Sequence, residues 1–508
     1  MPEKVLLGSE PLSAEQVVAV AREYAPVGLT GAAEARLAEK RQHIEDLAHA
    51  VTPTYGVSTG FGALATRHIP RESRTALQRS LIRSHAAGAG AHVETEVVRA
   101  LMLLRLRTLA SGFTGVRPGT ANTLAALLNA GITPVVHEYG SLGCSGDLAP
   151  LAAVALALMG EGEVEYNGDL VNAADALEHA GIEPVVLAEK EGLALTNGTD
   201  GMLGMLLLAA ADLRKLLDIA DITAAMSVEA LLGTDRAFAA DLQALRPHPG
   251  QAESAARMFQ ALQGSKIVES HRGPDCNRVQ DAYSLRCSPQ VHGGARDSLA
   301  HAELVASREL ASAVDNPVVL EDGRVESNGN FHGAPVAYVL DFLAIPLADV
   351  ASIAERRTDR MLDKTRSHGL PPFLAADPGV DSGHMIAQYT QAAVVSELKR
   401  LAVPASVDSI PSSAMQEDHV SMGWSSARKL RKAVDGLTTV LAIELLTAAR
   451  ALDMRAPLEP SPVTGRVRDL LRTKVEGPGP DRHLAPEIAA AEELVRSGAV
   501  LAAARLEV

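Results

Sequence analysis

Residues Met202–Leu232 form the stretch MLGMLLLAAADLRKLLDIADITAAMSVEALL, and its pattern sets the expected class of fold. Apolar residues recur along it at steps of three and four, the spacing that places them on one face of a helix. Charged residues such as Asp212, Lys215 and Asp221 interrupt the apolar run, so a membrane span is a poor interpretation. The stretch therefore predicts a long helix buried in the core of the protein.

The same periodicity recurs along much of the chain. It predicts further helices at Ala14–Tyr24, Glu34–Val51, Glu94–Ser111, Pro118–Ala130, Ala149–Met159, Ala334–Asp363, Met385–Ala402 and Met422–Asp453. Pro346 falls inside one of these runs and is expected to kink or split that helix, because proline lacks a backbone N–H and clashes with the preceding turn. Several runs exceed the usual length of a helix in a globular protein, which indicates a long helical bundle.

Strand signals are few. Two short stretches, Glu163–Val171 and Val318–Ser327, contain an Asn-Gly and an Asp-Gly dipeptide respectively, and both predict small hairpins. The predicted fold class is therefore mainly α, with a long central helical bundle, a loop-rich N-terminal part and a few short hairpins. We divide the sequence into a loop-rich region over residues 1–200 and a region with the long-helix bundle and the C-terminal part over residues 201–508.

The composition favours a helical globular protein and argues against some partners. Of the 508 residues, 47% are apolar, 21% are charged and only 3% are aromatic. Ala and Leu supply most of the apolar content, which favours helices over sheets. The formal net charge of −15 argues against binding to nucleic acid or to an anionic membrane surface, because both need a basic protein face. A small zwitterionic substrate in a locally positive pocket is compatible with this charge.

The cysteine content and the N-terminal residues bear on compartment and metal binding. Cys144, Cys276 and Cys287 are too few for a disulfide framework, and they lack the CxxC spacing of zinc ligands. We expect Cys276 and Cys287 to pack as small apolar groups. The N-terminal residues MPEKVLLGSEPLSAEQ lack a charged segment followed by a long apolar run, so they do not resemble a signal peptide, and we expect a cytoplasmic protein.

Common catalytic motifs are missing from the sequence. It contains no HExxH, no GxxxxGK[ST] and no GxGxxG that opens a helix. The stretch Gly140–Pro150, GSLGCSGDLAP, comes close to the GxSxG of serine hydrolases, but Asp147 stands where the last Gly is required. A serine hydrolase is therefore a poor fit. A second interpretation is a Gly-rich turn in which Ser145 or Asp147 caps the following helix.

Cys144-Ser145-Gly146 also permits a less common chemistry. Gly146 has no Cβ, so its backbone nitrogen is unshielded and its φ is free. In a tight bend this nitrogen can approach the carbonyl carbon of Cys144 and close a five-membered ring, which loses one water to give an imidazolone. Loss of a second water from Ser145 leaves a carbon–carbon double bond. The product is a strong electrophile, and the Cys144 side chain does not enter the ring.

Other segments share this texture of polar or aromatic residues embedded among glycines or within short motifs. They are Thr54–Gly62 (TYGVSTGFG), Arg83–Gly90 (RSHAAGAG), Gly192–Gly198 (GLALTNG), Gln280–Arg286 (QDAYSLR), Asn328–Gly333 (NGNFHG) and Gln416–Met422 (QEDHVSM). With Cys144-Ser145-Gly146, they resemble in type and order the motifs of the aromatic amino-acid lyases, and among these the histidine ammonia-lyases, which use a self-made methylidene-imidazolone (MIO). The resemblance runs from about Tyr55 to Trp424. Cys144, where Ala is usual, and Met415, where Asn is commoner, are departures that leave the ring chemistry intact.

The resemblance implies roles for the residues of these motifs. Cys144, Ser145 and Gly146 would form the MIO, with Ser145 supplying the methylidene carbon, and Asp147 would help the cyclisation. Tyr55 is the candidate base for the β-proton of the substrate. Its pKa must then fall below the usual value of ~10 for a tyrosine. The alternative for Tyr55 is a buried tyrosine that forms a hydrogen bond within a Gly-rich loop.

Further motif residues are candidates for lining the pocket. Tyr283 resembles a family residue that assists proton or ammonia handling. Arg286 follows three positions later, on the same helical face, and its guanidinium can hold a substrate carboxylate with two hydrogen bonds. The alternative for Arg286 is a surface salt bridge. Asn197 resembles the family's asparagine beside the MIO, while Gln280 and Phe331 resemble pocket-lining positions, although an aromatic such as Phe331 can also be simple core.

Two polar residues point to the identity of the substrate. His85 and Glu417 suit an imidazole ring, which donates and accepts hydrogen bonds. The phenylalanine-specific members of the family are usually apolar near the position that His85 resembles, so His85 argues against phenylalanine without excluding tyrosine. A structural histidine in a loop is the alternative. We expect His332 and His419 to be supporting residues.

The resemblance therefore implies an enzyme that converts L-histidine to trans-urocanate and ammonia, with the MIO as its own cofactor and no external cofactor or metal. It also implies a mainly α-helical fold and a homotetramer in which several chains build each site. Two rival activities share the MIO: a tyrosine ammonia-lyase, and an aminomutase that returns the ammonia to the β-carbon. A helical scaffold without catalytic activity, in which Ser145 stays uncyclised, is the alternative from another class.

Overall fold

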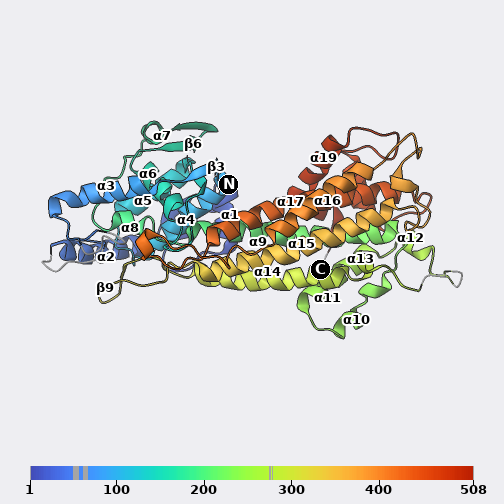
Figure 1. Cartoon of the computed structure of the whole chain (residues 1–508), viewed down its shortest axis with the longest axis horizontal. Helices are drawn as coiled ribbons and strands as arrows, with labels where there is room; N and C mark the ends of the chain where they lie inside the picture. The colour runs from blue at the N-terminus through green and yellow to red at the C-terminus, as the bar shows by residue number, and fades with distance from the viewer. Residues whose placement is uncertain (1, 50–55, 61–66, 274–275, 277–278, 507–508) are drawn as a thin grey trace. The chain divides into compact units, whose positions relative to one another are not determined.

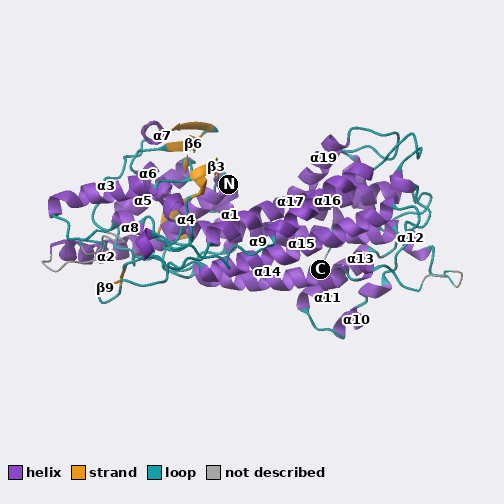
Figure 2. Cartoon of the chain, in the orientation of Figure 1, coloured by secondary structure: helices purple, strands orange, loops and turns teal. Residues whose placement is uncertain are grey.

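The computed structural model describes residues 2–49, 56–60, 67–273, 276 and 279–506 of the chain (Figure 1). Helices dominate these residues, and the few strands are short (Figure 2). The longest helices have 29 to 31 residues, which is the length expected of a long bundle. The predicted fold class is confirmed.

Contacts within the chain group it into two compact units, each built from three segments. The first unit consists of Met1–Leu208, Ala302–Asp341 and Pro404–Arg428, and the second consists of Ala209–His301, Phe342–Val403 and Lys429–Val508. Residues of both units occur in the long helices α9 (Asp200–Ala230), α14 (Ser288–Leu310), α15 (Ala334–Leu362) and α17 (Gly423–Asp453). Each unit combines segments that are distant in sequence. The predicted division of the sequence at residue 200 stays a prediction.

The first unit contains the described strands and the shorter N-terminal helices. Its further helices are α1 (Ala14–Arg22), α2 (Gly31–His49), α3 (Arg74–His85), α4 (Thr95–Ala110), α5 (Pro118–Ala130), α6 (Leu148–Leu158), α7 (Ala173–Ala180) and α8 (Glu191–Ala194). Its strands are β1 (Val5–Leu7), β2 (Val27–Leu29), β3 (Ala89–His92), β4 (Thr133–Pro134), β5 (His137–Tyr139), β6 (Glu163–Tyr166), β7 (Asp169–Asn172), β8 (Val318–Val319) and β9 (Val325–Glu326). The pairs β1–β2, β3–β5 and β8–β9 form separate small sheets, and β4–β6–β7 form a three-stranded one.

The second unit is helical in its described residues. Its further helices are α10 (Ala240–Ala244), α11 (Pro249–Ala261), α12 (Lys266–Glu269), α13 (Tyr283–Arg286), α16 (Met385–Leu401), α18 (Pro462–Arg472), α19 (Leu484–Arg496) and α20 (Ala499–Ala504). A fully buried ion pair lies in its core, where Arg357 Nε is 2.5 Å from Glu444 Oε1. Hydroxyl groups of Thr223 and Ser227 donate to the same carboxylate, each at 2.8 Å. These bonds offset the loss of hydration of a buried charge.

The helical periodicity placed most of the predicted helices within two or three residues of their observed ends. The stretch that predicted a helix at Met202–Leu232 forms α9, Asp200–Ala230, and α5 has the predicted bounds. Helix α14 was not predicted, because its paired Gly293-Gly294 lowers the helical signal. Here glycine serves close packing instead: a Cβ on Gly293 would lie 2.3 Å from the backbone nitrogen of Gln251 in α11.

Helix α15 contradicts one of the two effects expected of Pro346, a split of the helix. It continues through Pro346, so the helix is not split there. Proline removes one backbone donor, but buried residues before and after it, such as Leu343 and Val350, keep the helix packed. Among the described helices, α15 is long and apolar enough to cross a membrane by length and composition, although 61% of its most apolar window is buried within the protein.

Both predicted hairpins are present. Strands β6 and β7 pair in antiparallel fashion, and the turn residues Asn167 and Gly168 have φ values of 53° and 87°. Two successive positive φ values at an Asn-Gly dipeptide are those of a type I′ turn, which matches the twist of the strands. Strands β8 and β9 form the second hairpin around Gly323, which has a φ of 84°.

Candidate active site

The loop from Gly140 to Asp147 bends at glycines with positive φ. Gly146 has a φ of 81°, in the left-handed region that favours glycine. A Cβ at this position would lie 2.1 Å from the carbonyl oxygen of Gly198, a clash that no neighbouring side chain could relieve. Gly143 is constrained in the same way, since its φ is 66° and a Cβ would lie 2.3 Å from Ser421 Oγ. The backbone nitrogen of Gly146 is therefore unshielded by any side chain of its own.

Asp147 anchors the loop to the start of helix α9. Its backbone N–H donates to the carbonyl oxygen of Gly198 at 2.7 Å. Its carboxylate accepts from the backbone N–H groups of Gly201 at 2.8 Å and Met202 at 2.9 Å, and from Ser141 Oγ at 2.8 Å. A carboxylate at a helix N-terminus is stabilised by the free N–H groups and the dipole there.

The same geometry argues against the simple capping interpretation of the loop. Asp147 occupies the N-cap position of α6, but its side chain makes no capping bond to that helix. The hydroxyl of Ser145 lies 3.4 Å from Glu417 Oε1. Both side chains are thus directed to other partners, and the loop is held in place by elements distant in sequence.

Burial changes the protonation of Asp147. The carboxyl group is fully buried, which raises its pKa to about 7, while the bonds from Met202 and Ser141 pull in the opposite direction. A group with this pKa can both take up and release a proton near neutral pH. Asp147 is therefore suited to the proton transfers that two dehydrations require.

Glu417 lies beside the Cys-Ser-Gly triplet, although it is more than 270 residues away in sequence. Its Oε2 accepts from Cys144 Sγ at 3.1 Å and from Ser412 Oγ at 3.0 Å. Cys144 is buried, and Ser145 and Glu417 are half-buried. The Glu417 carboxylate therefore adjoins the side chains of both Cys144 and Ser145. Ser145 is the residue expected to supply the methylidene carbon.

His85, the last residue of helix α3, is close enough to Glu417 for the two to interact electrostatically. Burial lowers its pKa below the usual range, and the charge of Glu417 and a backbone hydrogen bond to Leu81 oppose this in part. Its Nδ1 lies 3.1 Å from Ser84 Oγ. His85 is thus mainly neutral at pH 7, and a neutral imidazole can both donate and accept a hydrogen bond.

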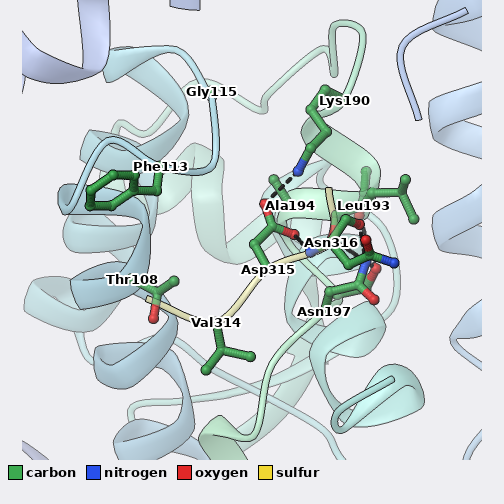
Figure 3. Close-up of polar contacts among 12 residues, drawn as sticks. Thr108, Phe113, Gly115, Lys190, Leu193, Ala194, Asn197, Val314, Asp315 and Asn316 are labelled. Atoms are coloured by element: carbon green, nitrogen blue, oxygen red, sulfur yellow. Dashed lines mark hydrogen bonds and ion pairs between the residues drawn. The ribbon is translucent and has the colours of Figure 1, made fainter. Parts of the chain in front are cut away.

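Asn197 follows helix α8 and is buried. Its Nδ2 donates to the carbonyl oxygens of Leu193 at 3.1 Å and Asn316 at 3.5 Å (Figure 3). These contacts fix the side-chain amide between the end of α8 and the loop that contains Asp315 and Asn316.

A buried ion pair lies next to the segments that hold Asn197 in the first unit. Figure 3 shows Lys190 directed at Asp315, and the ammonium and carboxylate groups are in contact. Burial lowers the pKa of Lys190 and raises that of Asp315, while each group's charge opposes the shift of the other. Asp315 Oδ1 also accepts from the backbone N–H of Asn316 at 2.7 Å. The pair therefore stabilises the backbone that holds Asn197.

Phe331 and the two motif histidines lie in loops of the same unit. Phe331 is half-buried. The rings of His332 and His419 stack with centroids 5.3 Å apart, and His332 Nε2 lies 3.2 Å from His419 Nδ1. The backbone N–H of Gly333 donates to the carbonyl oxygen of Gly143 at 3.1 Å, so the Phe331 loop is tied to the Cys-Ser-Gly loop.

Three predicted site residues belong to the second unit. Arg286 Cζ lies 4.7 Å from the centroid of the Tyr283 ring, so the two side chains share one face of α13 as predicted. Tyr283 is 71% exposed, and Gln280 is also exposed. Their placement in a common site with the first unit stays a prediction. Tyr55 lies outside the described residues, so its role also stays a prediction.

Several polar contacts around the triplet could not be predicted from the sequence. Ser412 lies outside the motifs, and its bond to Glu417 depends on a fold that joins distant segments. Ser141 and Ser421 were likewise not recognised, although Ser421 Oγ donates to the carbonyl oxygen of Gly143 at 2.7 Å. Serines in loops are too common for their type alone to indicate such roles.

The residues present fit the formation of an MIO from this loop. Gly146 tolerates no side chain, Ser145 adjoins Glu417, and the buried Asp147 can exchange protons near neutral pH. Within the described residues, no group of three His, Cys, Asp or Glu side chains is arranged to hold a metal ion.

The chain matches known proteins over nearly its whole length. A family model described as aromatic amino acid lyase matches residues 12–473. A histidine ammonia-lyase of Streptomyces avermitilis is 66% identical over 502 residues, which cover 98% of each chain. Among solved structures, a tyrosine aminomutase from Streptomyces globisporus superposes with a TM-score of 0.93 at 38% identity over 98% of each chain. A histidine ammonia-lyase from Trypanosoma cruzi gives 0.90 at 37% identity, over 99% of this chain and 95% of that one.

Proposed function

This chain belongs to the aromatic amino acid lyase family, and we propose that it eliminates ammonia from L-histidine to give trans-urocanate. Enzymes of this family depend on an MIO. The 66% identity to a histidine ammonia-lyase over nearly the whole chain supports the choice of substrate.

Glu417 lies beside Ser145, and its interaction with His85 carries the choice of substrate. Glu417 Oε1 is 3.4 Å from Ser145 Oγ, and Glu417 is close enough to His85 for its charge to affect the pKa of that ring. The imidazole of histidine has one N–H donor and one nitrogen acceptor when neutral. Glu417 can accept from that N–H, and neutral His85 can serve either nitrogen. A phenyl side chain could use neither group.

We infer that Cys144, Ser145 and Gly146 form the MIO of this protein. When formed, this group supplies an electrophile that activates the substrate amine as a leaving group. The chain's own residues support its formation: the positive φ of Gly146 bends the loop, and Asp147 can give a proton to departing water. The remaining chemistry needs a base for the β-proton, for which Tyr55 is the candidate, and it needs close contact before proton transfer.

We propose that each site is built by several copies of the chain in a homotetramer. Gln280 and Tyr283 are exposed, yet the resemblance gives them and Arg286 a place in the pocket. In this proposal Arg286 binds the substrate carboxylate with two hydrogen bonds, and Asn197 lies at the amino-acid end of the substrate.

Complementation between inactive variants tests the shared site. Ser145→Ala and Arg286→Gln proteins are each expected to have little activity, and unfolding and refolding them together should restore part of it, because some sites then receive both native residues. Refolding each variant alone is the control. If the mixture shows no more activity than its components while mass measurement detects mixed tetramers, each site is built by one chain.

A substrate panel tests the proposed reaction against its rivals. The protein should release ammonia from L-histidine and much less from L-tyrosine, and the product should be urocanate with no β-amino acid. His85→Phe should reduce kcat/KM for histidine while the protein stays folded, because the ring loses a polar partner. Release of ammonia from tyrosine alone would favour a tyrosine ammonia-lyase, and a β-amino acid product would favour an aminomutase.

A further inference from the structure

The two carboxylate oxygens of Glu417 have different surroundings. Oε2 accepts from Cys144 Sγ at 3.1 Å and from Ser412 Oγ at 3.0 Å. Oε1 faces Ser145 Oγ at 3.4 Å, a distance at which a hydroxyl bond is weak. All of these residues belong to the first unit. One oxygen is thus held by two donors, while the other is held loosely.

The backbone next to Glu417 is fixed, but it does not fix the carboxylate. Ser413, Ala414 and Met415 have φ values of 50°, 52° and 70°, a conformation that residues with side chains rarely adopt in succession. Paired backbone bonds close this turn, since the N–H of Ser412 donates to the Glu417 carbonyl at 2.9 Å and the reverse bond measures 3.3 Å. The orientation of the carboxylate beyond this point depends on the donors around it.

The thiol of Cys144 is a donor in this arrangement. Burial raises its pKa to about 12, and the hydrogen bond to Glu417 and the charge of that carboxylate act in the same direction. The sulfur therefore keeps its proton at neutral pH. A thiolate would repel the carboxylate, whereas the neutral thiol can donate to Oε2.

Ring formation would leave the two oxygens even less alike. The Cys144 side chain does not enter the ring, so its thiol is retained. Ser145 loses its hydroxyl group as water, and Glu417 Oε1 then loses the donor at 3.4 Å. Oε2 keeps both of its donors, and Oε1 becomes available to a ligand.

We propose that Cys144 is a positioning residue: with Ser412, its thiol holds Oε2 of Glu417 so that Oε1 faces the imidazole of the bound substrate. The inference rests on the proposed function, because it assigns Glu417 to the imidazole. It gives the side chain of Cys144 a purpose separate from the ring, which an alanine would form equally well. The choice of Cys at this position then affects the affinity for an imidazole and leaves the electrophile unchanged.

Binding of a ligand that cannot react isolates this effect. The probe is 3-(imidazol-4-yl)propionate, which has the imidazole and carboxylate of histidine but no amine, and 3-phenylpropionate is the matched control. Calorimetry would give the Kd of both for the native protein and for Cys144→Ala, Cys144→Ser and Ser412→Ala. We expect Cys144→Ala to reduce the preference for the imidazole ligand on the order of tenfold, the effect of one lost hydrogen bond to a charged group.

Rescue and kinetics separate positioning from a general structural effect. Cys144→Ser should recover most of the preference, because its hydroxyl can donate to the same oxygen, and Ser412→Ala should reduce the preference as Cys144→Ala does. In turnover, Cys144→Ala should raise KM for histidine while kcat changes little. An unchanged preference and an unchanged KM in Cys144→Ala would overturn the proposal.

Ring formation is checked independently by intact mass, as the loss of two waters. If Cys144→Ala does not form the MIO, the comparison is made in the Ser145→Ala background, where neither protein can form the methylidene and only the thiol differs. The same drop in imidazole preference is expected there, and its absence overturns the inference. Failure of the native protein to bind the imidazole probe or to consume histidine would instead contradict the proposed function itself.

Discussion

The backbone N–H of Asp147 donates to the carbonyl oxygen of Gly198 at 2.7 Å, and the Cα of Gly146 is so close to the same oxygen that a Cβ would lie 2.1 Å from it. The Cys-Ser-Gly loop therefore packs against the backbone at Gly198, just before helix α9. No side chain at residue 146 is compatible with this contact.

Gly146→Ala should prevent ring formation and destabilise the protein. The added Cβ clashes with backbone atoms, and a φ of 81° is strained for alanine, so the loop must move away from Gly198. Intact mass should show that no water is lost, and urea unfolding should show a lower midpoint. Gly168→Ala is the matched control, because Gly168 also has a positive φ but no atom within 4 Å of its Cβ position. Ring formation at native level in Gly146→Ala would refute this account of the loop.

Asp147→Asn should separate the structural role of this residue from its role in proton transfer. An amide oxygen can still accept from the N–H groups of Gly201 and Met202, but the side chain can no longer exchange a proton near neutral pH. The variant should fold and form the ring slowly, as followed by mass over time.

Asp147→Ala should also lower the free energy of unfolding relative to Asp147→Asn. It leaves the buried N–H groups of Gly201 and Met202 without their acceptor, at a cost of about 1–3 kcal/mol for each group. Equal ring formation in native protein and Asp147→Asn would show that the carboxyl proton is not needed.

The Lys190–Asp315 pair predicts a strong dependence of stability on both partners. Lys190→Met leaves the Asp315 charge buried without its counter-ion, which should lower the free energy of unfolding by about 3–5 kcal/mol. The double variant Lys190→Met/Asp315→Leu should lose less than the sum of the two single changes. Urea unfolding of all four proteins forms the thermodynamic cycle. Additive effects would mean that the ammonium and carboxylate groups do not stabilise each other.

His85 predicts a specific pH dependence of stability. Because burial lowers its pKa in the folded protein, the unfolded chain binds a proton more readily at this residue. The native protein should therefore lose stability relative to His85→Gln as the pH falls below the unfolded value of about 6.5. Comparing urea midpoints of the two proteins at several pH values cancels the contributions of other groups. A difference that stays constant, or grows in favour of native protein in acid, would contradict the neutral state of His85.

The fold was largely predictable from the sequence because helical periodicity is a local property. The bounds of α5 and the type I′ turn at Asn167-Gly168 follow from residues adjacent in the chain. Helix α14 was missed since its Gly293 contacts α11, a packing relation that no local pattern reports. Pro346 was expected to kink or split its helix, and the helix is not split. Burial along α15 outweighs the one lost backbone bond.

The candidate site was predictable only in part, because local patterns do not report contacts between distant segments. Its motifs stood out through their glycines and polar residues, which identified Ser145, His85 and Glu417. The bonds that orient them join segments hundreds of residues apart, as between Glu417 and Cys144. The donor from Ser412 could not be inferred, because a single serine outside a motif has no distinguishing signal.

Mixing the purified protein with L-histidine alone, while near-ultraviolet absorbance and free ammonia are recorded together, tests whether the protein is a histidine ammonia-lyase. We predict that absorbance grows as the urocanate ring conjugates with its new double bond, that ammonia appears in equal amount, and that Ser145→Ala abolishes both signals. Native protein whose intact mass shows the loss of two waters, yet which produces neither signal, would contradict the claim that it is a histidine-specific lyase.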